Sequence, residues 1–234
     1  PGSSRSVVRN RLELLQALSR DKDLAKIIYV AGRIDLSVDE HNQPVGEAHY
    51  RDPAFNWPAF EAAYDPKIWG RKKPEGALED ARRRSQERQA ETVIIALGSN
   101  TSLIGLGTDA ALINGGLMIK DAHNIIVHNL AFEDAYDYFP SWDPKDNEHG
   151  EWNSLYDNIT ISNSRRIWID HCTFSDGARP DKMNRVALGR PMQFHDGLVD
   201  IVRRSDLITL SYNLFKHHDK VMLIGNGDRV VMIA

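Results

Sequence analysis

The sequence is poor in cysteine, in long apolar runs and in excess charge of one sign. Its 234 residues include a single cysteine, Cys172, so an intrachain disulfide is excluded and the redox compartment is left open. No apolar run approaches the roughly 20 residues that a membrane-spanning helix requires. The 29 Lys and Arg residues nearly balance the 33 Asp and Glu residues, so the net charge is only −4. We therefore expect neither nucleic acid nor a membrane as a partner.

Two kinds of motif are also scarce. The sequence contains no G-x-S-x-G motif, which argues against a hydrolase built on a nucleophile elbow. Hairpin signals such as Asn226-Gly227 are rare, which argues against a β-sandwich of antiparallel pairs. From Val93 onward the chain consists instead of short apolar runs separated by Asn, Ser, Asp and Gly. Such a pattern is typical of short strands joined by bends.

The first 90 residues have a different pattern. The sequence there predicts, in order, a helix over 7–19, a buried strand over 26–36 that turns at Gly32, a long loop over 37–74 and a charged helix over 76–90. The run Arg82-Arg83-Arg84 in the last helix is expected on a solvated face, with a polyanion-binding patch as the alternative.

The apolar runs after Val93 repeat. Four of them align when Leu103, Ile125, Ile167 and Ile208 are taken as equivalent, with spacings of 22, 42 and 41 residues. Each run also follows a shorter strand-like segment. One coil of about 22 residues, with two long insertions, predicts an all-β chain folded as a right-handed, single-stranded parallel β-helix. We expect one such domain over 1–234, with an N-terminal capping helix and long loop insertions; a β-sandwich with uneven loops is the alternative.

Six motifs occur in an order that resembles the pectate lyase family of extracellular polysaccharide lyases. They are NTSLIGLG, FEDAYDYFPSWDP, YDNITIS, IWIDHCTFSDG, HDGLVDI and SYNLFKHHDK, and the resemblance extends from about Ile27 to the last residue. It implies a right-handed parallel β-helix, secretion from the cell, and Ca²⁺-assisted β-elimination of polygalacturonate. The fold inferred from the repeat agrees with it.

The stretch FHDGLVDI places Asp196 and Asp200 four positions apart in an apolar run. Unpaired buried charges are costly, so such a pair is expected to share a cation or to face solvent. An even separation puts two side chains on the same face of a strand, and hard oxygen ligands suit Ca²⁺. By resemblance, Asp157 matches the third calcium-binding aspartate of the family. The alternative is that each aspartate caps a turn.

Substrate contacts and the catalytic base follow from the resemblance. Lys220 matches a family lysine that contacts a substrate carboxylate; the alternative is a surface lysine paired with Asp219. Arg190, with Arg179 and Arg185 in the loop 175–191, is a candidate carboxylate clamp. The family's base, an arginine, would lie in a coil beyond Ala234, because the sequence context of Arg203, Arg204 and Arg229 does not match it. His217 and His218 are interpreted as structural.

Two further groups have open interpretations. Tyr138, Phe139 and Trp142 in the insertion 134–144 either stack on sugar rings or pack over an end of the β-helix. In IWIDHCTF, the residues Trp168, Asp170 and His171 resemble a family motif, and the resemblance implies packing and hydrogen bonding away from the calcium cleft. Cys172 is expected to be a small buried hydrophobe.

Two functions from other classes remain as alternatives. One is a metal-free β-helix glycosidase that hydrolyses pectin with paired carboxylates, and the other is a non-catalytic β-helix protein that binds polysaccharide. The sequence ends in the apolar run RVVMIA, which predicts a missing set of C-terminal coils. On this expectation a second chain supplies those coils and the base arginine, and the 234 residues alone aggregate and are inactive.

Overall fold

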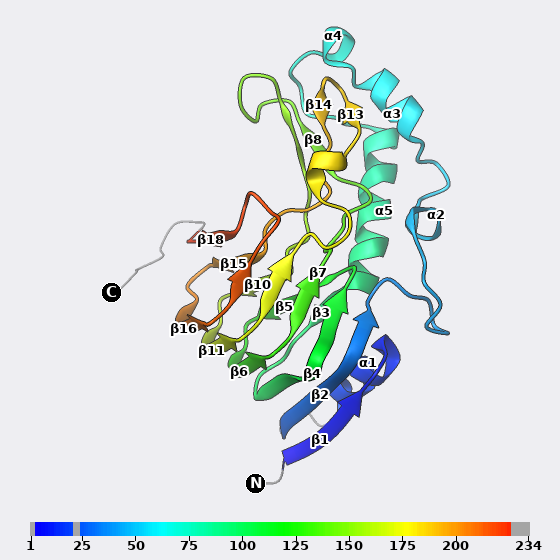
Figure 1. The fold of residues 1–234 in the computed structure, drawn as a ribbon. Coiled ribbons are helices and arrows are strands. Elements are labelled where there is room, and N and C mark those ends of the chain that lie inside the picture. Colours follow the sequence, from blue (N-terminus) through cyan, green and yellow to red (C-terminus); the bar gives the residue numbers. More distant parts are fainter. Residues whose placement is uncertain (1–2, 21–23, 226–234) are drawn as a thin grey trace.

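The computed structural model describes residues 3–20 and 24–225, in which three consecutive coils each contain three parallel strands (Figure 1). The coils comprise β5 (Gly116–Lys120), β6 (His123–His128) and β7 (Ala131–Glu133); β10 (Ile159–Ser162), β11 (Arg165–Asp170) and β12 (Thr173–Ser175); and β15 (Val199–Val202), β16 (Asp206–Ser211) and β17 (Leu214–Phe215). Before them come β3 (Ile94–Ala96) and β4 (Thr101–Ile113), and after them β18 (Met222–Ile224).

The strands stack into two sheets. The smaller sheet has the order β18-β15-β10-β5-β3, and the larger contains β16-β11-β6-β4-β7-β12-β17 together with β2 and β1. The long strand β4 pairs with β6 through its first half and with β7 through its second half, so it joins two faces of the larger sheet. The architecture is the predicted right-handed parallel β-helix.

The observed register confirms most of the predicted repeat. Ile167 pairs with both Ile125 and Ile208, as the alignment required. The first repeat is wrong by two residues, because Ile125 pairs with Thr101 and Leu103 pairs with Val127. A shift of two residues keeps the same side chains facing inward, so alternating hydrophobicity cannot detect it.

The interior of the β-helix is filled by inward-facing residues of successive coils. Phe174 stacks between Phe132 and Phe215, with ring centroids 5.2 and 5.0 Å apart and interplanar angles of 9° and 13°. Cys172 is buried in the same core, as expected. Each coil therefore supports the next through like side chains in register.

The N-terminal segment differs from the prediction. Residues Ser3–Val8 form strand β1, which pairs with β2 (Ala25–Asp35), and the helix α1 is confined to Arg11–Ser19. The Asn10 side chain accepts a hydrogen bond from the Glu13 backbone N–H, which fixes where the helix begins. At Gly32 the strand does not end: φ is +76° there, and the pairing on β4 skips from Leu106 to Ala111, so the extra residues lie in β4 opposite Gly32.

The region predicted as a long loop contains three short helices. These are α2 (Glu47–Tyr50), α3 (Trp57–Ala63) and α4 (Pro66–Trp69), and they precede the predicted charged helix, α5 (Ala77–Val93). On α5 the Arg82 side chain is buried and bonded to Glu79, so the expectation of a wholly solvated arginine run is wrong for this residue. In Figure 1 these helices lie together at one side of the coils.

The helices and the loop insertions share a second hydrophobic core. Phe139 and Trp142 are buried in it, so these two aromatic residues pack in the interior and are not available to stack on sugar rings. The insertions carry two hairpins and a 3₁₀ helix: β8 (Ser141–Asp143) with β9 (Glu151–Asn153), β13 (Val186–Ala187) with β14 (Arg190–Pro191), and η1 (Asp181–Met183).

Among the described residues, no helix has the length and apolar character needed to cross a membrane.

Candidate metal and substrate site

The three predicted aspartates converge where β10 and β15 begin. Asp157 precedes β10, while Asp200 lies within β15 and its backbone pairs with that of Thr160. The Asp157 carboxylate accepts hydrogen bonds from the Gly197 N–H at 2.8 Å and from the Thr160 hydroxyl at 2.6 Å. Neighbouring coils thus bring together carboxylates that are about 40 residues apart in the sequence.

The prediction that Asp196 and Asp200 lie on the same face of one strand is wrong. β15 begins at Val199, so Asp196 lies in the loop before the strand and does not share a strand face with Asp200. Gly197 brings the residues together instead. A Cβ atom at this position would lie 2.7 Å from Asp200 Oδ1 and 3.0 Å from Asp157 Oδ1. The missing side chain therefore leaves open the space between two carboxylates.

The electrostatics of this cluster favour a cation. Burial, followed by the charge of Asp200, raises the pKa of Asp157 to about 7. Burial and the charge of Asp196 also raise the pKa of Asp200. Carboxylate oxygens around an open space, with their charges incompletely compensated, fit a hard divalent cation such as Ca²⁺.

The aspartates line a cavity of about 1170 Å³ along the smaller sheet. Arg203 and Arg204 line it as well, and both have left-handed backbone conformations, with φ of +52° and +56°. Arg229, the third arginine considered in the sequence, lies outside the described residues. The cavity thus presents cationic side chains as well as the carboxylate cluster.

The predicted substrate contacts separate into two places. Lys220 Nζ lies 3.1 Å from Asp196 Oδ1, so its carboxylate partner is Asp196 and not Asp219. Arg190 instead pairs with Glu151 and lines a second cavity of about 550 Å³. The structure therefore brings Lys220 to the aspartates but does not bring Arg190 to them.

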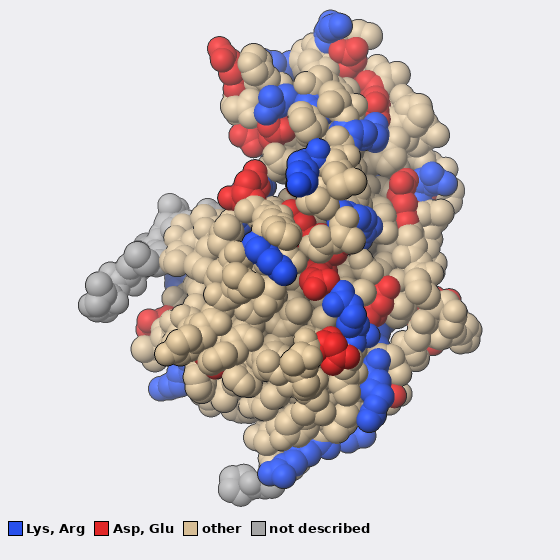
Figure 2. All heavy atoms as spheres, viewed as in Figure 1, with Lys and Arg blue, Asp and Glu red and all other residues tan. Residues whose placement is uncertain are grey.

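The other two loop arginines also have internal partners. Arg185 forms an ion pair with Glu61. Arg179 binds Asp134 at 2.8 Å and lies 3.9 Å from the centroid of the Tyr136 ring. These contacts use the arginines to hold the insertions in place. In the upper part of Figure 2, Lys and Arg side chains are interspersed with Asp and Glu side chains.

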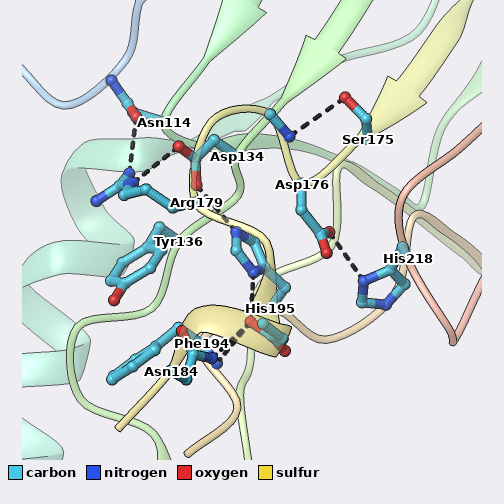
Figure 3. Close-up of polar contacts among 12 residues, drawn as sticks. Asn114, Asp134, Tyr136, Ser175, Asp176, Arg179, Asn184, Phe194, His195 and His218 are labelled. Atoms are coloured by element: carbon cyan, nitrogen blue, oxygen red, sulfur yellow. Dashed lines mark hydrogen bonds and ion pairs between the residues drawn. The ribbon is translucent and has the colours of Figure 1, made fainter.

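A buried network beside Asp196 was missed by the sequence reasoning (Figure 3). The His195 side chain lies between Asp134 Oδ1 at 2.9 Å and Asp181 Oδ1 at 2.8 Å. Burial lowers the pKa of His195, but the two carboxylates outweigh it and raise the pKa to about 9. The only available sequence signal was a histidine directly preceding Asp196.

His218 forms the other side of this network, as Figure 3 shows. Its Nδ1 lies 2.8 Å from Asp176 Oδ1, and its Nε2 lies 2.6 Å from the Asp196 carbonyl oxygen. The side chain is almost fully buried, which agrees with the structural interpretation of this residue. The Asp196 backbone is thereby anchored from the loop between β17 and β18.

The family-like motif in IWIDHCTF lies on the larger sheet, away from the three aspartates. Asp170 is buried and accepts hydrogen bonds at the ends of β6, β11 and β16 from His128, His171 and Ser211. Trp168 is 46% exposed. A hydrogen-bonding role for Asp170 agrees with these contacts.

Comparisons with known proteins agree with this architecture. The family model described as pectate lyase matches residues 64–231. A pectate lyase of Bacillus subtilis (strain 168) is 46% identical over 222 residues, covering 94% of this chain and 53% of that protein. The structure of a thermostable pectate lyase matches with 52% identity and a TM-score of 0.93, covering 96% of this chain and 55% of that one. A pectate lyase bound to a hexasaccharide matches with 44% identity and a TM-score of 0.93, covering 96% and 56%.

The chain thus spans about half the length of the curated and solved relatives that it matches.

Proposed function

Because the chain belongs to the pectate lyase family, we propose that it contributes to calcium-dependent cleavage of polygalacturonate by β-elimination. The observation that carries the proposal is the group of Asp157, Asp196 and Asp200 around the side-chain-free position of Gly197. Polygalacturonate has a carboxylate on every sugar, so an acidic site attracts it only through a bridging cation.

Asp157, Asp196 and Asp200 would hold Ca²⁺ in this proposal. When bound, the ion orients the uronate carboxylate and withdraws charge from it, which acidifies the hydrogen on the adjoining ring carbon. Lys220 contacts a substrate carboxylate, as the resemblance implies, and Arg203 and Arg204 supply further positive charge along the cavity. His218 holds the Asp196 backbone in position.

Proton abstraction is assigned by family resemblance alone, to an arginine whose sequence context none of Arg203, Arg204 and Arg229 matches. A guanidinium is a poor base unless its surroundings lower its pKa strongly, so this role rests on the resemblance and not on a geometric argument. The expected second chain has no support from the relatives above and is not part of the proposal. Secretion from the cell remains part of it, on the same resemblance.

The test is product analysis on de-esterified polygalacturonate with the protein that carries this chain. Elimination yields 4,5-unsaturated ends, which absorb in the ultraviolet, and the absorbance should rise with added Ca²⁺ and stop with EDTA. Asp200→Asn should reduce the rate, while Asp206→Asn, a carboxylate on β16 of the other sheet, should not.

Two results would redirect the proposal. Saturated reducing ends as the sole product, formed in EDTA, would support the glycosidase alternative. Calcium-dependent binding of the polymer without any cleavage would support the non-catalytic alternative.

A further inference from the structure

Two histidines and an aspartate converge on the larger sheet, in a cluster separate from the three acidic residues of the smaller sheet. His128 ends β6 and Asp170 ends β11, and the two residues pair in register. His128 Nδ1 lies 3.0 Å from Asp170 Oδ2, and His171 Nδ1 lies 2.7 Å from the same oxygen. The three candidate ligand atoms all lie within 4.8 Å of one another.

Neighbouring side chains orient the groups of this cluster. The Ser211 hydroxyl donates to Asp170 Oδ1 at 2.6 Å, and the Trp168 indole N–H donates to Ser211 Oγ at 2.8 Å. Oδ1 is therefore engaged while Oδ2 faces the imidazoles. The Tyr212 ring stacks on His171, with centroids 5.0 Å apart. Such outer contacts orient metal ligands in known sites.

Exposure leaves room for further ligands from solvent. The side chain of Asp170 is 6% exposed, whereas those of His128 and His171 are 41% and 56% exposed. The cluster offers one buried carboxylate ligand and two accessible imidazole ligands.

We propose that His128, Asp170 and His171 form a binding site for a divalent transition-metal ion of the Zn²⁺ type. Imidazole nitrogen suits Zn²⁺, Co²⁺, Ni²⁺ and Cu²⁺, whereas Ca²⁺ takes oxygen ligands, so this site is selective against the ion proposed for the aspartates. Two imidazoles and one carboxylate, with water completing the coordination, are a recurrent arrangement for these metals. Neutral histidines then carry their proton on Nε2 and bind through Nδ1.

The test uses Co²⁺ as a spectroscopic probe. The purified chain, stripped of metal and then supplied with excess Ca²⁺, is titrated with CoCl₂, and visible absorption bands of bound Co²⁺ should appear at one equivalent. Added Zn²⁺ should remove them. His128→Gln and His171→Gln should each weaken Co²⁺ affinity by at least ~10-fold. His41→Gln, which removes an exposed imidazole outside the cluster, should leave the affinity unchanged.

Three results would overturn the proposal. The first is the absence of a bound Co²⁺ spectrum, and the second is equal affinity in the wild type and in both histidine variants. The third is loss of the Co²⁺ signal in Asp200→Asn, which would place the metal at the other cluster. Unfolding curves measured in EDTA should be alike for wild type, His128→Gln and His171→Gln, so that a change in affinity reports on the ligands.

Discussion

At the scale of single residues, the missing side chain of Gly197 matters as much as the carboxylates around it. Asp157, Asp196 and Asp200 are the groups that the sequence singled out, yet two of these carboxylates are separated only by the space that a Cβ would fill. The backbone at Gly197 is in a conformation that other residues adopt, so a substitution there tests the space and not the fold.

Gly197→Ala should weaken Ca²⁺ affinity at least ~10-fold, equivalent to about 1.4 kcal/mol, because the new methyl group lies between the ligands. Calorimetric titration with CaCl₂ measures it. Gly98→Ala is the matched control, since a Cβ there meets nothing within 4 Å. Equal Ca²⁺ affinities in the two variants would show that the open space at Gly197 is not needed for Ca²⁺ binding.

Asp157 should make the stability of the calcium-free chain depend on pH. Its folded pKa, about 7, lies above the value of about 4 for an unfolded aspartate. Its contribution is therefore fully present below pH ~4 and is lost as the pH rises through 7, by about 4 kcal/mol at most. In EDTA, Asp157→Asn should be more stable than wild type at pH 8 and not at pH 4, as measured by urea unfolding.

Calcium supplies the control for this prediction. The ion binds the ionised carboxylates of the folded state. Saturating Ca²⁺ should therefore stabilise the wild type at pH 8 and make it more stable than Asp157→Asn. A pH-independent difference between wild type and Asp157→Asn in EDTA would contradict the raised pKa.

At the scale of elements, helix α5 illustrates how burial divides a run of identical residues. Arg82 is 4% exposed in its side chain and binds Glu79 at 2.8 Å, with further bonds to Gln86 and the Phe139 carbonyl. Arg83, its neighbour, is 60% exposed. The helix was predicted from its composition, but a charge pattern does not reveal which arginine meets the loop insertion.

Arg82→Ala should destabilise the fold by about 3 kcal/mol, because it leaves the partly buried Glu79 carboxylate and the Phe139 carbonyl without their donor. Arg83→Ala should change stability by less than about 0.5 kcal/mol. Thermal or urea unfolding of the two variants at neutral pH provides the comparison. Similar losses in both would mean that Arg82 contributes only as a surface residue does.

At the scale of the whole molecule, stability passes from coil to coil through the interior. Phe132, Phe174 and Phe215 stack in one column, each contributed by a different coil. Removing the middle ring leaves a cavity between Phe132 and Phe215. The adjacent coils hold these two rings in place, so they cannot move in to fill it.

Phe174→Ala should therefore cost about 3–5 kcal/mol of unfolding free energy. Tyr212→Ala, which removes an aromatic ring that is 84% exposed on the outer surface, should cost far less. Urea unfolding followed by circular dichroism measures both. A loss below about 1 kcal/mol for Phe174→Ala would mean that the column does not couple the coils.

Alternating hydrophobicity, together with the repeat, was sufficient to determine the parallel β-helix and the pairing of Ile125, Ile167 and Ile208. A strand's inward face recurs every two residues and a coil recurs at a fixed period, so both are local signals. The same signals could not set the register of Leu103, where a two-residue shift leaves the inward face unchanged. They also could not detect the helices α2–α4, whose few residues are held by the second hydrophobic core.

Asp196 and Asp200 were named from their spacing in the sequence, and Asp157 and Lys220 from the resemblance, since a motif retains residue types and their order. Only the tertiary structure decided which partners they have: Lys220 with Asp196, Arg190 with Glu151, and His195 between two carboxylates. Those contacts join segments from different coils and insertions, and their strength depends on burial, which changes pKa values and the cost of an unpaired charge. The sequence carries the donors and acceptors, but the stacking of coils determines which of them meet and how far each is removed from water.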